Sequence, residues 1–231
     1  MEPNVTATNV ELEKPSLWAV ITSPSLQFER MKQKAPIGLP MLLMAVLYAV
    51  IGALSGYFVA SSPEVAGQMP ADIPEEAQFF ASATFVAIIG GAGALIGIPL
   101  LFLITALFYK ICMMIMGNDT SYKKLLSISI YTSVIGVLGG VLNVLLMAIF
   151  GGLDVQYTSL APLFETGTML HRIGAAFEVF SIWSLVVTAI ALQKTAGLRK
   201  GQAITLVVIF FAISLGLSML GGMFGNASVA P

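Results

Sequence analysis

The chain has 231 residues, of which 57% are hydrophobic and only 10% are charged. Soluble domains average about 45–50% apolar and about 25% charged residues, so this composition excludes an ordinary soluble domain and indicates a membrane protein. The formal net charge of −1 argues against a nucleic-acid partner, which requires a clustered basic surface.

Apolar runs along the chain predict the membrane spans. A hydrocarbon core about 30 Å thick requires on the order of 20 apolar residues in a helix. Four runs meet this length without a charged residue, and one further run is interrupted only by Glu178. The sequence therefore predicts an all-α integral membrane protein, a bundle of five transmembrane helices. In chain order they cover residues 37–60, 77–109, 125–152, 173–193 and 202–224.

The positions of the basic residues orient this bundle. Lys and Arg in short loops mark the cytoplasmic side of a membrane protein, whereas acidic residues contribute little. Of the 11 Lys and Arg residues, all but Arg172 fall before the first span or in the connections after the second and fourth spans. Five spans therefore place the N-terminus in the cytoplasm and the C-terminus outside. Without the Glu178 helix, Lys194, Arg199 and Lys200 would move to the acidic side.

The segment before the first span combines apolar and basic residues. Ser23 and Pro24 suit the N-cap and first position of a helix, and Arg30, Lys32 and Lys34 follow. We expect a short amphipathic segment at the anionic inner surface, with a flexible basic tail as the alternative. The predicted organisation is a disordered tail (1–14), an interfacial segment (15–36), a membrane domain (37–224) and a short C-terminal tail (225–231).

Small residues spaced four apart predict where helices pack, because helices in a bilayer associate through close backbone approach. Packing within the protein's own bundle is the first expectation, and a surface for a partner protein or a second copy of the chain is the alternative. The pairs are Gly52 and Gly56 in the first span, Gly93 and Gly97 in the second, Gly136 and Gly140 in the third, and Ser214 and Ser218 in the last.

Pro99 lies in the second run, which is longer than one membrane crossing. A bend, a re-entrant start or an interfacial first turn would each absorb the extra length. A proline removes the backbone bond to the carbonyl four residues earlier, here that of Leu95, so a kink is expected between these residues. Such a kink either packs within the bundle or exposes carbonyls to a binding cavity, as broken helices do in transporters.

Glu178 is the charged residue inside a predicted span. The fourth helix leaves the membrane at Lys194, about 24 Å further along its axis, which places Glu178 near the outer interface. Asn143 lies at a comparable depth on the third helix and is the predicted hydrogen-bond partner, with His171 as a second candidate. We expect a structural, hydrogen-bonded carboxylate; a proton relay is the alternative.

Residues for catalysis or metal binding are sparse. The sequence holds one cysteine, Cys112, and one histidine, His171. It contains no Gly-rich phosphate loop, no H-E-x-x-H and no G-x-S-x-G motif. No catalytic residue, metal site or cofactor is therefore predicted.

Three stretches share an ordered set of landmark residues: a Ser-Pro followed by an aromatic residue, an aromatic-basic helix start ending at a tyrosine, and an acidic-x-Phe-x-x-Trp helix followed by a glycine and an alanine. This order resembles the Yip family, membrane-domain proteins first known as interactors of Ypt and Rab GTPases, over residues 15–224. The Asp-Leu-Tyr-Gly-Pro element of eukaryotic members is absent, and the chain is similar to bacterial members. The matching residues are Ser23, Pro24, Phe28, Tyr122, Lys123, Tyr131, Glu178, Phe180, Trp183, Gly197 and Ala203.

The resemblance implies a non-enzymatic, multi-pass protein of the cell membrane that acts as a scaffold or assembly factor. It further implies helix–helix contacts with subunits of an ABC-type efflux transporter, in toxin protection. A small permease or channel subunit, with Glu178 and the Pro99 kink lining a path, is the alternative. An intramembrane enzyme is least favoured, because the sequence supplies no nucleophile with a base.

Overall fold

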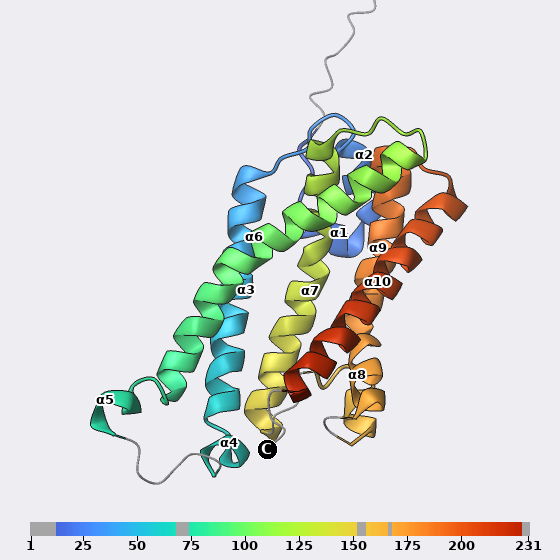
Figure 1. Ribbon diagram of the computed structural model, residues 1–231. Coiled ribbons are helices and arrows are strands. Elements are labelled where there is room, and N and C mark those ends of the chain that lie inside the picture. The colour runs from blue at the N-terminus through green and yellow to red at the C-terminus, as the bar shows by residue number, and fades with distance from the viewer. Residues whose placement is uncertain (1–12, 68–73, 152–155, 166–167, 228–231) are drawn as a thin grey trace, which may run out of the picture.

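The computed structural model describes residues 13–67, 74–151, 156–165 and 168–227, and all regular structure in these ranges is helical (Figure 1). Five helices in this part of the chain are long and apolar enough to cross a membrane. The predicted all-α bundle of five spans is therefore confirmed. The five are α3 (Gly38–Ala60), α6 (Ala83–Ile115), α7 (Tyr122–Phe150), α9 (Val179–Ala196) and α10 (Lys200–Ala227).

Short helices lie at both ends of the bundle (Figure 1). One end holds α1 and α2 together with the α6–α7 and α9–α10 connections, and we call it the basic end because most Lys and Arg residues lie there. The other, the distal end, holds the remaining short helices. The short helices are α1 (Ala19–Thr22), α2 (Pro24–Arg30), α4 (Pro63–Ala66), α5 (Glu75–Gln78), η1 (Ala161–Leu163) and α8 (Met169–Ala176).

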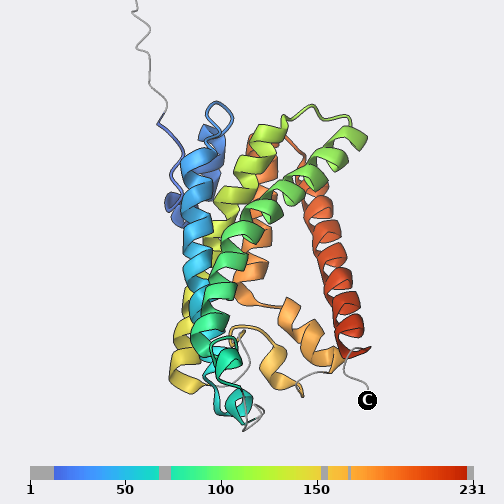
Figure 2. The same cartoon turned by 60° about the vertical axis from the view of Figure 1, so that its left-hand side comes forward.

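The core centres on α7, which packs against α3, α6 and α9. Its side chains Leu125, Ile128, Ile130, Val134 and Ile135 are fully buried. On one side of α7 the helices α3 and α6 form a pair, and on the other side α9 pairs with α10 (Figures 1 and 2). This arrangement leaves α6 and α10 at the periphery.

Two spans begin later than predicted because capping residues set their starts. α6 begins at Ala83 instead of residue 77, since the Ser82 hydroxyl accepts a hydrogen bond of 3.2 Å from the Phe85 amide. α9 begins at Val179 instead of residue 173, because Glu178 caps it. The stretch 173–176 belongs to α8. Counting apolar residues did not detect these caps.

The last span also differs at its far end. α10 continues through residues 225–227, which the sequence assigned to a C-terminal tail. The tails expected at 1–12 and 228–231 lie outside the described residues.

The α3–α6 pair is held by glycine contacts. A Cβ added at Gly52 would lie 2.8 Å from the Gly90 carbonyl oxygen, and one added at Gly56 would lie 3.0 Å from the Val86 carbonyl oxygen. The two backbones are therefore in direct contact, as helices in a bilayer require for close association.

Gly93 and Gly97 were expected to pack the second span, but the α6 side of this contact runs along Gly90 and Gly91 instead. A Cβ added at Gly93 or Gly97 would meet no atom within 4 Å in the described structure. α6 also remains helical across Pro99, so the kink there stays a prediction.

The N-terminal segment docks on the bundle. Val20, Phe28 and Met31 are fully buried, with α1 against α7 and α2 against α9. The Tyr131 hydroxyl donates to the Pro15 carbonyl oxygen at 3.1 Å. The protein itself therefore covers part of the apolar face of this segment, and its position at the inner membrane surface stays a prediction.

Candidate functional site

Glu178 forms the N-terminal cap of α9 and is only 7% exposed. Its Oε1 accepts a hydrogen bond from the Phe180 amide at 3.0 Å, and its Oε2 accepts one from the Ser181 amide at 2.6 Å. The first amides of a helix lack partners within the helix, and the positive end of the helix dipole favours a negative charge there. The sequence therefore tolerates a carboxylate at this depth because α9 supplies its donors.

Thr158 joins this carboxylate to Asn143. The Thr158 hydroxyl donates to Glu178 Oε1 at 2.6 Å and accepts from Asn143 Nδ2 at 2.9 Å. The Thr158 amide also donates to Asn143 Oδ1 at 3.2 Å. Asn143 and Glu178 are thus brought together through Thr158; the direct bond expected between them is not among the hydrogen bonds of the described residues.

His171, the second candidate partner of Glu178, lies on α8 and contacts a backbone carbonyl instead of Glu178. Its Nδ1 is 3.1 Å from the Ala161 carbonyl oxygen of η1. Gly174 supports the same contact, because a Cβ there would lie 2.9 Å from the Leu160 carbonyl oxygen. The histidine therefore ties α8 to the preceding loop.

A cleft of about 510 Å³ lies among the five long helices, and we call it the hydroxyl cleft. Its wall mixes hydroxyl side chains with aliphatic and aromatic ones. The hydroxyl residues are Tyr48, Thr105, Tyr109, Ser129, Thr132, Ser133, Ser181, Ser184, Thr188 and Ser214; the apolar side chains are Ile98, Leu101, Phe102, Leu185 and Phe210; and Gly136 completes the lining.

Gly136 shapes the cleft wall. A Cβ at this position would collide with the hydroxyl of Tyr48. Because the glycine leaves room, the Tyr48 hydroxyl reaches across from α3 and donates to the Ser133 carbonyl oxygen at 2.9 Å. Gly140, one turn further, receives the Ile51 side chain. Both glycines therefore pack α7 against α3.

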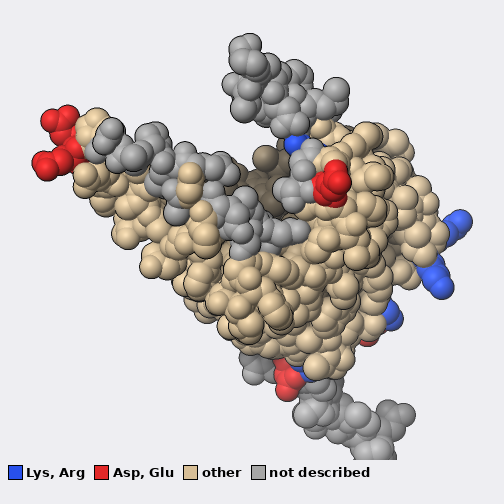
Figure 3. Space-filling view, turned by 90° about the horizontal axis from the view of Figure 1, so that it is seen from below, with Lys and Arg blue, Asp and Glu red and all other residues tan. Residues whose placement is uncertain are grey.

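Two smaller cavities adjoin the hydroxyl cleft toward the distal end. One, of about 280 Å³, is lined by Asn143 and Glu178 and shares Tyr48, Gly136 and Ser181 with the cleft. Viewed from the distal end, the molecule is hollowed (Figure 3).

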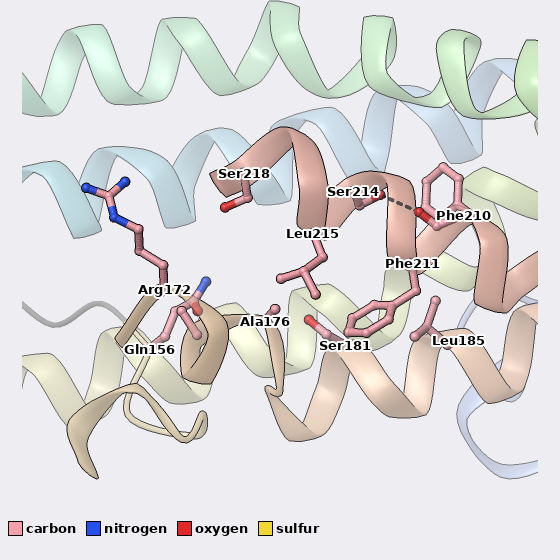
Figure 4. A pocket seen from close by; sticks show the side chains of 11 residues that line it. Gln156, Arg172, Ala176, Ser181, Leu185, Phe210, Phe211, Ser214, Leu215 and Ser218 are labelled. Atoms are coloured by element: carbon pink, nitrogen blue, oxygen red, sulfur yellow. Dashed lines mark hydrogen bonds between the residues drawn. The ribbon is translucent and has the colours of Figure 1, made fainter. Parts of the chain in front are cut away.

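The other cavity, of about 340 Å³, lies between α8, α9 and α10 (Figure 4). Arg172 and Ser218 line it, and Ser181 and Ser214 belong to both this cavity and the cleft. Ser214 and Ser218, expected in helix packing, thus line cavities. Pro99 is not part of the lining, although its neighbour Ile98 is.

The residues that match the family pattern lie where helices contact each other or end. Phe180 packs over Gly139 of α7, where a Cβ would lie 2.7 Å from the Phe180 Cβ, and its ring lies 6.2 Å from that of Trp183. Gly197 ends α9 with a φ of +71°, a region that favours glycine. Ala203 is fully buried.

The landmarks before the first span have local roles. Pro24 occupies the first turn of α2, and the Ser23 side chain makes no capping hydrogen bond. The Phe28 carbonyl oxygen accepts a hydrogen bond of 2.8 Å from the Thr195 hydroxyl of α9. Phe28 therefore fixes α2 to α9 through both its buried ring and its backbone.

Charged residues at the basic end form exposed pairs. Lys194 Nζ lies 3.0 Å from Glu29 Oε1, and this hydrogen bond and positive charge hold the pKa of the Glu29 carboxyl below its usual value. Arg30 contacts Glu13 and Gln27. Lys32 and Lys34 are exposed.

Potential metal ligands are dispersed in the part of the chain that the structure describes. Within the described ranges, no group of three or more His, Cys, Asp or Glu side chains is placed to hold a metal ion. In the Asn143–Thr158–Glu178 cluster, the Thr158 hydroxyl is held between Glu178 and Asn143. Beside this cluster, the structure has a cleft lined by apolar and hydroxyl side chains of the five long helices.

Comparison with known proteins gives a family match across all five spans. The Yip1 domain matches residues 18–222 of the chain. Over 233 aligned residues, covering 100% of both chains, the sequence is 35% identical to the membrane protein YknW of Bacillus subtilis (strain 168). No solved structure matches.

Proposed function

We propose that this chain, which belongs to the Yip1 domain family of membrane proteins, is a non-enzymatic scaffold or assembly factor. It acts in the cell membrane through helix–helix contacts, with the basic end facing the cytoplasm. The subunits of an ABC-type efflux transporter are the proposed partners, in toxin protection. That partner comes from the resemblance to bacterial family members, and a second copy of the chain is the alternative partner.

The main support for this proposal is the exposed surface of α6. Gly52, Gly56, Gly136 and Gly140 are used in contacts between helices of the chain, whereas Gly93 and Gly97 are exposed and face open space. Large apolar side chains flank the two glycines on the outside of the bundle: Ile89, Ile96 and Leu100 are each more than half exposed. A small-residue pair between large apolar side chains is the surface on which another transmembrane helix packs closely.

Co-purification tests the scaffold. The full chain is isolated from its native membrane in mild detergent, and membrane proteins that accompany it are identified. A Gly93→Val and Gly97→Val double variant should recover about tenfold less partner, which corresponds to about 1.4 kcal/mol of lost association free energy. Gly216→Val is the matched control, because Gly216 is also helical with no atom within 4 Å of an added Cβ. Equal recovery with the double variant contradicts the proposal.

The hydroxyl cleft favours a second candidate, a small permease. A cavity between spans that carries hydroxyl side chains can form part of a substrate pathway, and Glu178 lines the adjoining cavity. The scaffold proposal predicts that the purified chain moves no solute across liposomes. Reproducible flux that Glu178→Gln abolishes would favour the permease instead.

A further inference from the structure

Hydroxyl side chains gather where the bilayer is most apolar. Thr132 and Ser133 lie near the middle of α7, Ser184 near the middle of α9 and Ser214 near the middle of α10. All four line the hydroxyl cleft. Lipid tails offer no hydrogen bonds, so a hydroxyl at this depth needs a partner in the protein backbone, in another side chain or in a ligand.

Six of the hydroxyl groups that line the cleft donate to backbone carbonyls. Thr132 donates to the Ile128 carbonyl oxygen at 3.0 Å, and Thr188 donates to the Ser184 carbonyl oxygen at 2.8 Å. Ser214 donates to the Phe210 carbonyl oxygen at 2.9 Å, the dashed bond of Figure 4. Ser129, Ser133 and Tyr48 also donate to backbone carbonyls.

A hydroxyl that donates to its own helix still has lone pairs to offer. Its oxygen also becomes a better acceptor, because chains of hydrogen bonds polarise one another. These six hydroxyl oxygens therefore offer hydrogen-bond acceptors within a mostly apolar cleft. A ligand group that is rich in hydrogen-bond donors would complement these acceptors.

Helices α6 and α10, which border the cleft, meet toward the basic end and diverge toward the distal end. The Phe210 ring of α10 lies 5.4 Å from the Phe108 ring and 5.5 Å from the Tyr109 ring of α6, which joins these helices toward the basic end. From there α6 and α10 diverge toward the distal end (Figure 2). Leu101 and Phe102 of α6 and Leu185 of α9 supply apolar lining. An occupant can therefore have an apolar body next to its polar group.

The negative charge of Glu178, next to the cleft, favours a ligand whose polar group is positively charged. The Glu178 carboxylate lines the adjoining cavity, which shares Ser181 with the cleft. It accepts three hydrogen bonds, from Thr158, Phe180 and Ser181, and a carboxylate has about four acceptor positions. Arg172 lines the cavity beyond Ser181 and already has an interaction partner.

We propose that the hydroxyl cleft binds an amphiphile with a primary ammonium group, held by hydroxyl oxygens of α7, α9 and α10 on the side of Glu178. A primary ammonium carries three donors and no acceptor, which matches the six hydroxyl oxygens that act as acceptors. The volume of about 510 Å³ lies within the range of about 300–1,000 Å³ typical of small-molecule sites. The apolar body of the ligand lies against Leu101, Phe102 and Leu185. This site is independent of partner recruitment by α6.

Binding of three probes with one chain length tests the headgroup. The full chain in phosphatidylcholine nanodiscs is titrated with dodecylammonium, dodecanol and dodecyl sulfate, and empty nanodiscs correct for partitioning. Dodecylammonium should bind about tenfold more tightly than dodecanol, and dodecyl sulfate should bind most weakly. Equal affinity for the three probes overturns the proposal.

Variants test the location. A Ser133→Ala and Ser214→Ala double variant should bind dodecylammonium about tenfold more weakly. Thr205→Val is the matched control, because Thr205 is exposed on α10 and outside the cleft lining; it should bind as the unmodified chain does. Circular dichroism and melting temperature establish that both variants are folded. Unchanged binding by the double variant overturns the proposal.

Photo-cross-linking provides a readout that does not depend on a variant. A diazirine analogue of dodecylamine should label residues 181–188 of α9 and 210–214 of α10. Labelling confined to the outer face of α6, around Ile89 and Ile96, overturns the site. Adding phosphatidylethanolamine to the nanodiscs distinguishes two sources of the same chemistry: competition identifies a lipid headgroup, and its absence identifies a soluble amphiphile.

Discussion

Glu178 holds together three parts of the chain at the start of α9. Its carboxylate accepts hydrogen bonds from two amides of α9 and from Thr158 in the preceding loop, and Thr158 bonds to Asn143 of α7. A buried carboxylate is costly unless its hydrogen-bonding capacity is used. Because these donors are fixed by the backbone and by α7, the cluster supports a structural role over a proton relay.

Glu178→Ala should lower the free energy of unfolding by about 2–4 kcal/mol, because a helix cap is lost and buried donors lose their acceptor. The measurement is unfolding in detergent micelles, followed by circular dichroism. Glu165→Ala is the control, since Glu165 is exposed at the same end of the molecule. Equal stability of the two variants would contradict the capping role.

The Glu29–Lys194 pair predicts a local pH dependence. The hydrogen bond and charge of Lys194 lower the Glu29 pKa, so the contribution of this pair is present above the usual carboxyl pKa and is lost as the pH falls through the lowered value. Lys194→Gln should raise the Glu29 pKa toward its usual value, as measured by a carboxyl NMR titration. Lys32→Gln should shift it less, because Lys32 is the smaller cause; a larger shift would contradict this assignment.

At the residue scale, sequence patterns identified the polar positions better than their partners. Glu178 and Asn143 stood out as polar groups in apolar runs, and they do lie in one cluster. Thr158 was missed because nothing in the spacing of a loop threonine shows which helices it lies between. The cap at Glu178 was missed because Ser, Thr, Asp and Asn are the usual N-caps.

The α3–α6 pair shows that glycine position on a helix determines its effect. Gly52→Val should destabilise the chain by about 1–3 kcal/mol, because the added atoms meet the backbone of Gly90, which has no side chain to move aside. Gly93→Val should leave the stability of the isolated chain within about 0.5 kcal/mol of its original value. Thermal unfolding in detergent measures both, and a larger loss for Gly93→Val would contradict the observed packing.

Docking of the N-terminal segment is tested by proteolysis. Tyr131→Phe removes the bond to Pro15, worth about 1 kcal/mol, so trypsin should cleave within residues 30–34 about fivefold faster. Tyr57→Phe is the control, because Tyr57 is 46% exposed on α3. An unchanged cleavage rate for Tyr131→Phe would mean that this hydroxyl does not hold the segment.

At the element scale, apolar length was enough to find all five spans. It was not enough to find their starts, because Phe79 and Phe80 look like span residues but lie in an exposed turn before Ser82. The N-terminal helices had a recognisable apolar face. Periodicity reveals that such a face exists but does not show whether lipid or protein covers it, and here Phe28 and Met31 are covered by protein.

Most basic residues and the Glu178 cluster lie toward opposite ends of the molecule. The connections that carry basic residues meet at one end, where Asn118 Nδ2 donates to the Ala196 carbonyl oxygen at 3.0 Å and Lys194 pairs with Glu29. The start of α9, which Glu178 caps, lies toward the distal end (Figure 1). The positions of the basic residues predicted this grouping, because successive spans place the connections alternately on the two sides of the membrane.

The hydroxyl cleft could not be predicted from the sequence. Its lining comes from five helices, and single serines and threonines in apolar spans resemble ordinary packing residues. Only the packing of α6 and α10 around one side of α7 and α9 brings the hydroxyls of these helices to one space. The small-residue pattern predicted packing at Ser214 for the same reason.

The proposed topology has five spans, with the basic end in the cytoplasm and the Glu178 end outside. Single cysteines at two exposed positions, Gln33→Cys at the basic end and Glu165→Cys at the distal end, test this in a Cys112→Ser background. Intact cells are treated with a membrane-impermeant maleimide. We predict labelling of the Glu165→Cys chain in intact cells and of the Gln33→Cys chain only after permeabilisation; the reverse pattern, or labelling of both in intact cells, would contradict the account.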